Sequence, residues 1–428
     1  MKAQMQIILD KLLATGADKA SVRLVNTHSE EFNIIYKRLS FMRTVESSRL
    51  TLFVIKDQRS ATISVNQLED AEIDKAITTM FTNMESGVPD PAMDISPAQE
   101  AQTWESGDKL PNSQTAIIRM NELIADMRQK FPQVEYDATL THNSHYSCYL
   151  NSNGADFVDN QAYYSFSITF TSKQDNRCSS MNYSFIALRN SDVRLLEQAN
   201  IEELIRQNTE QVITRPIPES FIGDVIFYPL QVCRTVDGFL ESQIGSFPFL
   251  SNSCKFPDHI GKQVLDSKLT LKNAPDYKGF AVAARITDDG FASQNATVIE
   301  NGVLRHYPIN LYTANKCNMK RTLGDPSSYL IEAGDTALAD MIKSVEKGVL
   351  LVRQSGDSAN SDGDISFVAK NSYYIEDGKI QYPISETMIA GNIVNWLQNI
   401  RAISRETLNN GYWQCPYFLI PEVNISRK

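Results

Sequence analysis

The sequence has few of the residues that most often carry hydrolytic or redox chemistry. It contains 5 histidines in 428 residues, and no HExxH, GxSxG, Walker A or GxGxxG pattern occurs in it. Its 6 cysteines are scattered without a CxxC pair, which excludes the common zinc-ribbon and thioredoxin-like spacings. Scattered cysteines in a chain of this size are typical of reduced thiols in a cytoplasm. No familiar catalytic motif therefore identifies a site.

Long apolar runs and an excess of basic residues are also lacking. No stretch approaches 18 consecutive apolar residues, so we expect no membrane-spanning helix. Asp10 and Lys11 interrupt the first apolar stretch, which argues against a secretory signal peptide. Lys and Arg number 41 against 51 Asp and Glu, for a net charge of -10, and the basic residues form no concentrated patch. We therefore expect no direct contact with nucleic acid or with a membrane.

Length and pattern predict an α+β protein with two domains. A chain of 428 residues is too long for one ordinary core, and its 42% hydrophobic and 21% charged residues are typical of globular proteins. Strands come in runs between helices, which predicts antiparallel or mixed sheets flanked by helices. Pro216 and Pro218 mark a boundary. We expect an N-terminal α+β domain over 1–215 and a β-rich C-terminal domain over 216–428.

The N-terminal domain begins with a helix followed by a run of strands. Apolar residues at helical spacing predict an amphipathic helix over 1–13, with Gly16 as a left-handed cap. The expected buried face of this helix consists of Met5, Ile7, Ile8 and Leu12. Alternation of apolar and polar residues over 21–65 predicts an antiparallel meander. Apolar residues at spacings of three and four predict a second helix over 68–85.

The same order of elements then repeats, so this domain is expected to consist of two similar halves. The proline-containing segment 87–111 is predicted to be a linker that buries little. Ser113 is the expected N-cap of the third helix. Strand periodicity returns over 134–188, where Asn153-Gly154 predicts a two-residue hairpin turn. A fourth helix is predicted over 201–212.

In the C-terminal domain the pattern predicts mostly strands and turns. We expect a short buried strand over 224–228, followed by a helix over 230–244. Asn301-Gly302 and Asp377-Gly378 each predict a type I′ hairpin turn, because both of its central residues need positive φ. Apolar residues at helical spacing predict one late helix over 393–403.

The histidines and cysteines give weak evidence for a metal or a nucleophile. His142 and His145 lie in a segment that reads as a strand, where an odd spacing places them on opposite faces, although on a helix they could share one. Zinc needs three or four convergent ligands. His28 is expected in a polar turn. Nothing adjacent to Cys415 would lower the pKa of its thiol, so a buried structural thiol is favoured.

Several short motifs follow one another along nearly the whole chain. They are Gly16-Ala17-Asp18, Asn151-Ser152-Asn153-Gly154, Asp288-Asp289-Gly290, Ile299-Glu300-Asn301-Gly302-Val303, Ser366-Phe367, Tyr374-Ile375-Glu376-Asp377-Gly378-Lys379-Ile380, Pro383 and Gly391-Asn392. In their order and spacing these motifs resemble the TldD/PmbA family, whose members were once called modulators of DNA gyrase.

The resemblance also implies where a metallopeptidase site would lie. In the TldD-type subunit a helix of the C-terminal domain carries HExxxH, whose histidines bind zinc together with a cysteine near the C-terminus, while the Glu activates water. Here Arg234, Thr235 and Phe239 stand at the three motif positions, and Cys415 is followed by a proline instead of Gly-Lys. Arginine keeps its proton at working pH and phenylalanine has no donor atom. The resemblance therefore implies no catalytic residue, metal or cofactor in this chain.

These departures place the chain with the PmbA (TldE) branch. The resemblance then implies a cytoplasmic, non-catalytic subunit of a TldD/TldE-type metallopeptidase complex that processes unfolded or leader peptides. The expected partner is a TldD-type subunit or a second copy of this chain. Two alternatives stay open. One is a stand-alone hydrolase with relocated chemistry at Cys415 or at His142 and His145, and the other is a homodimeric peptide-binding or scaffold protein.

Overall fold

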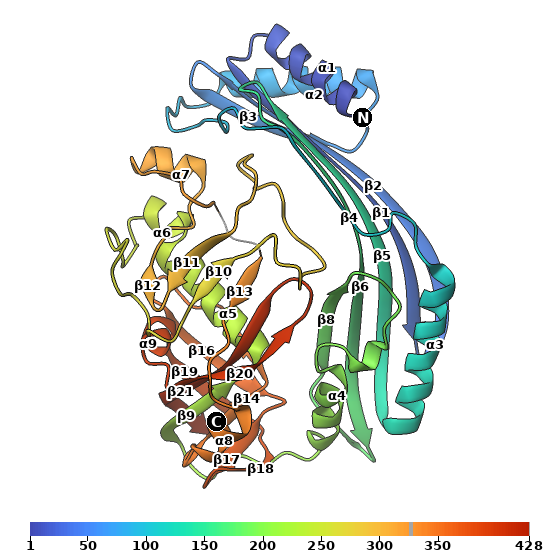
Figure 1. The fold of residues 1–428 in the computed structure, drawn as a ribbon, viewed down its shortest axis with the longest axis vertical. Helices are drawn as coiled ribbons and strands as arrows, with labels where there is room; N and C mark the ends of the chain where they lie inside the picture. The colour runs from blue at the N-terminus through green and yellow to red at the C-terminus, as the bar shows by residue number, and fades with distance from the viewer. Residues whose placement is uncertain (325–327, 428) are drawn as a thin grey trace.

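Two mixed sheets with flanking helices make up the computed structural model, which describes residues 1–324 and 328–427 (Figure 1). Within these residues, strands up to residue 188 form an eight-stranded sheet, and strands from residue 221 onward form a 13-stranded sheet. The predicted α+β class is thereby confirmed. The division of the chain into domains at residue 215 stays a prediction.

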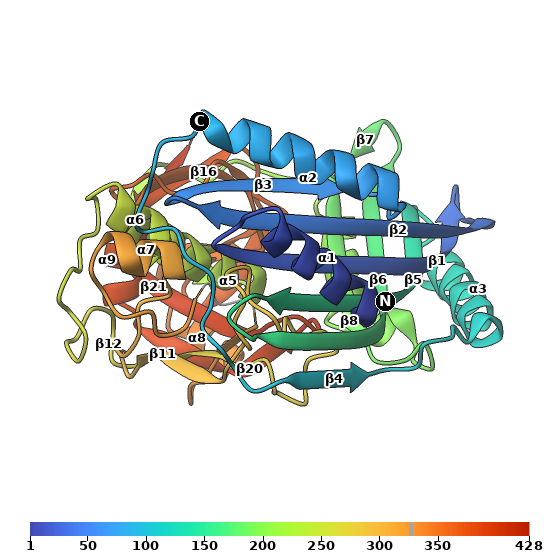
Figure 2. The ribbon, with the colours of Figure 1, turned by 90° about the horizontal axis from the view of Figure 1, so that it is seen from above.

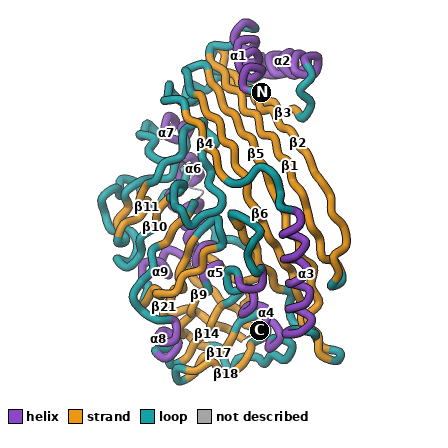
Figure 3. Tube along the Cα trace, turned by 45° about the vertical axis from the view of Figure 1, so that its right-hand side comes forward, coloured by secondary structure: helices purple, strands orange, loops and turns teal. Residues whose placement is uncertain are grey.

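The first sheet is dominated by four strands of 17 to 19 residues. Its strands are β1 (Lys19–Ile35), β2 (Arg38–Lys56), β3 (Arg59–Val65), β4 (Gln102–Ser106), β5 (Val134–Asn151), β6 (Asp156–Gln174), β7 (Arg177–Cys178) and β8 (Asn182–Leu188). The order along the sheet is β3-β2-β1-β5-β6-β4, with β8 and β7 also pairing with β6. Because β1 pairs with β5 over most of its length, the two predicted halves share one continuous sheet, whose strands run side by side in Figure 3.

Two pairs of helices cover opposite ends of this sheet, and Figure 2 shows the first pair above β1 to β3. The pairs are α1 (Lys2–Ala14) with α2 (Asp70–Glu85), and α3 (Ser113–Lys130) with α4 (Ile201–Glu210). The predicted cap after α1 is confirmed, since Gly16 has φ of 104° and its N–H donates to the carbonyl of Leu13. Of the residues predicted on the buried face, Met5, Ile8 and Leu12 are buried as expected, whereas the prediction was wrong for Ile7, which is 66% exposed.

One predicted helix cap and one predicted turn differ from the structure, because asparagine side chains form the local hydrogen bonds. Asn112, not Ser113, caps α3, since its side chain accepts a hydrogen bond from a backbone N–H of the first turn. The predicted two-residue hairpin at Asn153-Gly154 is wrong, because the β5–β6 connection spans four residues and only Gly154 of that pair has positive φ. The side chain of Asn151 accepts two backbone N–H groups within the connection.

The second sheet consists of shorter strands around a central strand. Its strands are β9 (Phe221–Phe227), β10 (Leu271–Asn273), β11 (Ala296–Glu300), β12 (Val303–Leu304), β13 (Tyr329–Ile331), β14 (Lys347–Leu351), β15 (Arg353–Gly356), β16 (Asp364–Lys370), β17 (Tyr373–Glu376), β18 (Lys379–Pro383), β19 (Thr387–Asn392), β20 (Ala402–Asn409) and β21 (Gln414–Arg427). β9 lies between β14, which is parallel to it, and β21, which is antiparallel. This position explains why the second half of β9, residues 225–227, is consecutively apolar and buried.

The short helices of this part are α5 (Pro229–Phe239), α6 (Ser246–Leu250), α7 (Leu311–Lys316), α8 (Leu338–Lys343) and α9 (Ile393–Gln398). Both predicted type I′ turns are confirmed, because Asn301-Gly302 and Asp377-Gly378 have positive φ and join β11 to β12 and β17 to β18. The late helix is shorter than predicted. It ends at Gln398, and Ile403 already belongs to β20.

The proline-containing segment 87–111 is integrated into the structure. Ala92 and Ile95 are buried, and residues 102–106 form β4, which pairs in parallel with β6. Asp90 forms an ion pair with Lys316 of α7. The prediction that this segment buries little was therefore wrong, because its contacts come from residues distant in the sequence: β6 lies 55 positions away and Lys316 lies 226 positions away.

Candidate functional site

The candidate site centres on α5, which follows the central strand of the second sheet. Tyr228 precedes the helix, and Pro229 occupies its first turn, where the missing N–H of proline costs nothing. Val232, Val236 and Phe239 are buried and pack the helix against the core. After Phe239 the chain continues as a π-helical turn over 240–244. Arg234 is the one exposed residue of the helix, all of which lies in the described range.

The three positions implied by the resemblance point in different directions. The Arg234 guanidinium is exposed, and its Nη2 donates to the Tyr183 hydroxyl of β8 at 2.8 Å. The Thr235 hydroxyl donates to the carbonyl one turn earlier, at 2.9 Å. Phe239 lies in the core with its ring centroid 5.8 Å from that of Phe256. The structure therefore does not bring these three side chains together.

These side chains also do not fit a zinc ion. Arginine stays protonated and phenylalanine has no lone pair, so neither can act as a ligand. Cys415 is fully buried, and burial together with the neighbouring Cys233 thiol raises the pKa of the Cys415 thiol well above its usual value. In the described ranges, no three His, Cys, Asp or Glu residues lie close enough to hold a metal ion. We derive no metal-dependent step from these residues.

The two central histidines remain separate, as their spacing in a strand predicts. Both lie on β5, where burial lowers the pKa of each imidazole. His142 is buried, with its Nε2 2.8 Å from a backbone carbonyl oxygen, whereas His145 stacks on Tyr163 at 5.9 Å. His28 was wrongly expected in a turn, since it lies within β1 opposite Glu46 of β2.

A cavity that sequence reasoning missed lies beside the C-terminal end of α5. It has a volume of about 700 Å³, and its lining includes Asp237, Glu241, Phe247 and Tyr329. The Tyr329 hydroxyl donates to Asp237 Oδ1 at 3.0 Å. Burial and the negative charge of Asp237 raise the pKa of Glu241. The spacing of four residues predicts that Asp237 and Glu241 lie on the same face of a helix. No local pattern in the sequence predicts that Tyr329 lines the same cavity.

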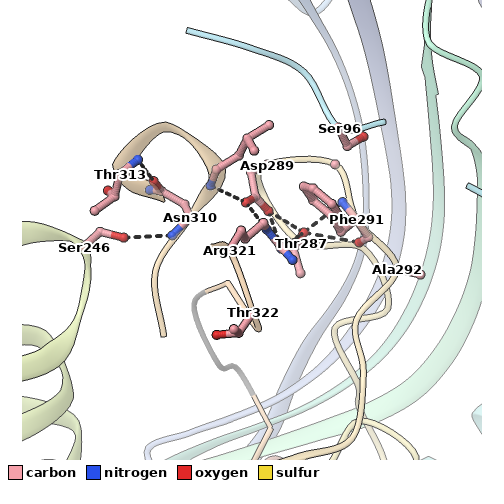
Figure 4. Close-up of polar contacts among 12 residues, drawn as sticks. Ser96, Ser246, Thr287, Asp289, Phe291, Ala292, Asn310, Thr313, Arg321 and Thr322 are labelled. Atoms are coloured by element: carbon pink, nitrogen blue, oxygen red, sulfur yellow. Dashed lines mark hydrogen bonds and ion pairs between the residues drawn. The ribbon is translucent and has the colours of Figure 1, made fainter. Parts of the chain in front are cut away.

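A buried ion pair holds the loop 285–292 beside this part of the molecule (Figure 4). Arg321 donates to both oxygens of Asp289, at 2.7 Å from Nε and 2.9 Å from Nη2. Asp289 also accepts from the Thr287 hydroxyl at 2.6 Å and the Leu311 N–H at 2.8 Å. Burial alone would raise the pKa of Asp289, but these hydrogen bonds and the Arg321 charge lower it. The Arg321 guanidinium lies 3.5 Å from the ring centroid of Phe291.

The same loop contacts the first sheet and the segment before β4. Arg23 of β1 donates to the Thr287 carbonyl at 2.7 Å. Gln99 donates to the Gly290 carbonyl at 3.0 Å and accepts from the Ala292 N–H at 3.1 Å. The Asp288-Asp289-Gly290 motif, which carries part of the family resemblance, thus lies in the loop that connects the two sheets.

Comparison with known proteins defines the class of the C-terminal part. The family model of the PmbA/TldA metallopeptidase C-terminal domain matches residues 223–427, which include β9 and α5. The chain is 22% identical to the metalloprotease PmbA of Escherichia coli O157:H7 over 97% of this chain and 94% of that protein. It is 26% identical to a metalloprotease PmbA homolog of Haemophilus influenzae, over 52% of this chain but only 48% of that protein. These matches confirm the resemblance to the TldD/PmbA family that the motifs predicted.

Two solved structures share the complete fold. A Bacteroides thetaiotaomicron protein named for a modulator of DNA gyrase superposes with a TM-score of 0.89 at 20% identity, over 100% of this chain and 99% of that chain. TldE from Thermococcus kodakarensis superposes with a TM-score of 0.84 at 16% identity, over 99% of this chain and 100% of that chain. Among the helices of 1–324 and 328–427, none combines the length and apolar character needed to cross a membrane.

Proposed function

We propose that this chain is a PmbA/TldE-like subunit of a cytoplasmic metallopeptidase complex and has no zinc site of its own. One observation carries the proposal. The chain retains the fold of the metallopeptidase domain, yet α5 places an exposed arginine at 234 and a core phenylalanine at 239. An intact domain whose motif positions hold no metal donor fits a subunit retained for assembly and substrate contact.

The complementary subunit would be a TldD-type chain that carries HExxxH and binds the zinc ion. In such a heterodimer this chain would form the dimer interface and part of the wall of a channel that encloses unfolded or leader peptides. Strand edges can hold an extended peptide through backbone hydrogen bonds, because an edge presents unpaired N–H and C=O groups. The relatives named metalloprotease PmbA and the structural neighbour named TldE support this assignment.

Three measurements on purified protein test the assignment. The chain is expressed alone and together with a TldD-type chain from the same genome, and molar mass is measured by light scattering. Zinc is measured by mass spectrometry, and cleavage of an unstructured peptide is followed with and without chelator. We expect a heterodimer with zinc and chelator-sensitive cleavage, and neither property in the single chain. Stoichiometric zinc or chelator-sensitive cleavage in the single chain would overturn the proposal.

The relocated-chemistry alternative receives little support from the side chains it needs. The Cys415 thiol is fully buried with a raised pKa, so little thiolate forms near neutral pH. His142 is also buried, and it does not converge with His145. The homodimer alternative predicts a stable dimer of this chain that gains no partner on co-expression, which the same light-scattering measurement detects.

A further inference from the structure

Two arginines from different elements converge on one tyrosine beside α5. Arg234 of α5 donates from Nη2 to the Tyr183 hydroxyl at 2.8 Å. The guanidinium carbon of Arg353, the first residue of β15, lies 4.9 Å from the centroid of the same ring. Arg353 is half-buried, and its Nη1 donates to the carbonyl of Met181. Tyr183 and Met181 come from the first part of the chain, so this cluster joins both parts of the structure.

The positive charge of this pair is not compensated. Neither Arg234 nor Arg353 forms an ion pair with any carboxylate of residues 1–324 or 328–427, unlike Arg321 and Arg194. Burial and the charge of Arg234 lower the pKa of Arg353. Like charges held close together in a partly buried place repel each other, and a bound anion removes that repulsion. Each guanidinium has five N–H donors, so donors remain free for such an anion.

An apolar cavity lies beside Tyr183, the residue that both arginines contact. It has a volume of about 210 Å³, and Tyr183 forms part of its wall. Its remaining lining is mostly apolar and includes Ile186, Leu204, Leu230, Leu408 and Trp413. A ligand that carries an anionic group next to an apolar group therefore suits the site better than a free inorganic anion does.

We propose that Arg234 and Arg353 bind the C-terminal carboxylate of a peptide, whose apolar last side chain enters the cavity beside Tyr183. Guanidinium groups bind carboxylates through paired N–H donors, which gives both strength and orientation. Peptides with an apolar C-terminal residue would thus be the substrate class of the proposed function, and this inference rests on that function. At position 234, where the family resemblance places a zinc ligand of the active subunit, this chain would instead position the end of the peptide.

Binding of matched fluorescent peptides, measured by anisotropy to the chain alone and to the complex, tests the site. One peptide ends in leucine with a free carboxylate, a second is the same peptide with an amidated end, and a third is amidated but contains an internal glutamate. Neither of the first two peptides contains an acidic side chain. We expect the free carboxylate to bind about tenfold more tightly than the amide. Arg234→Gln and Arg353→Gln should each remove most of that difference.

Arg177→Gln is the matched control, because Arg177 is exposed on β7 and loses the same charge. It should leave the preference for the free carboxylate unchanged. Arg234→Lys keeps the charge without the planar fork and should retain part of the preference. Far-UV circular dichroism verifies that each variant is folded.

Three outcomes decide between the proposals. Equal binding of free and amidated peptides overturns this inference and leaves the partner-subunit function intact. Tight binding of the glutamate peptide that is lost in the arginine variants overturns the C-terminal assignment, because the carboxylate would then come from a side chain. Absence of binding by all three peptides, to the chain and to the complex, overturns peptide contact by this subunit itself.

Discussion

Replacing Asp289 with asparagine should destabilise the protein strongly, because it breaks the ion pair that joins the loop 285–292 to Arg321. The side chains of Asp289 and Arg321 are only 14% and 11% exposed. Asparagine keeps the shape of the carboxylate, but it leaves the guanidinium buried without a negative partner. Removing one member of such a buried pair typically costs about 3–5 kcal/mol. We expect Asp289→Asn to lower the free energy of unfolding by roughly this amount.

Equilibrium unfolding in urea, followed by circular dichroism, measures the loss. Asp340→Asn is the control, because Asp340 is 64% exposed and pairs with Lys343 on the same helix, where an ion pair contributes less than about 1 kcal/mol. The double variant Asp289→Leu, Arg321→Met should recover most of the loss, since it leaves no unpaired charge. A loss for Asp289→Asn no larger than that for Asp340→Asn would refute this view of the loop.

The low pKa of Asp289 gives the same experiment a pH dependence. A carboxyl group whose pKa is lower in the folded state contributes stability above its unfolded pKa, which is about 3.9 for aspartate. This contribution is lost as pH falls through the folded pKa. The gap in unfolding free energy between wild type and Asp289→Asn should therefore be constant near neutral pH and shrink below about pH 4.

Three further predictions concern other buried groups. Burial raises the pKa of Asp159 to about 6, so stability should fall as pH rises from about 4 to 6, and Asp159→Asn should remove about 1–2 kcal/mol of that fall in urea titrations at the two pH values. Asn151→Ala should cost at least about 2 kcal/mol in thermal or urea unfolding, because the buried amide donates to Ser96 and accepts two backbone N–H groups. Cys415 should react with a thiol reagent far more slowly than exposed Cys178, as measured by peptide mapping after timed labelling.

Elements whose cause is local could be predicted from the sequence. The apolar stripe of α2, the turn at Gly16 and the hairpins at Asn301-Gly302 and Asp377-Gly378 depend on residues within a few positions of each other. Helical spacing and the need for positive φ are sufficient there. The same reasoning explains why the fold class and the four helices of the first part, α1 to α4, were predicted correctly, whereas β4 and the short helices α6, α7 and α8 were not predicted.

Features that depend on distant residues could not be predicted. The segment 87–111 reads as a linker, and only its contacts with α7 and β6 show that it is part of the packed structure. The identities of Arg234 and Phe239 showed that no zinc ligand stands there, but not that Arg234 meets Arg353 across Tyr183. Those three residues are separated by at least 51 positions, and no periodicity relates them.

The long pairing of β1 with β5 determines whether fragments of this protein can fold separately. A cleavage in the segment before α3 would leave two fragments, each with a row of unpaired backbone groups along a strand of 17 or 18 residues. Exposed edges of that length favour aggregation unless they find each other again. The two helix-and-strand repeats are therefore inseparable as modules, and fragments co-expressed after such a cut should associate with each other far better than either survives alone.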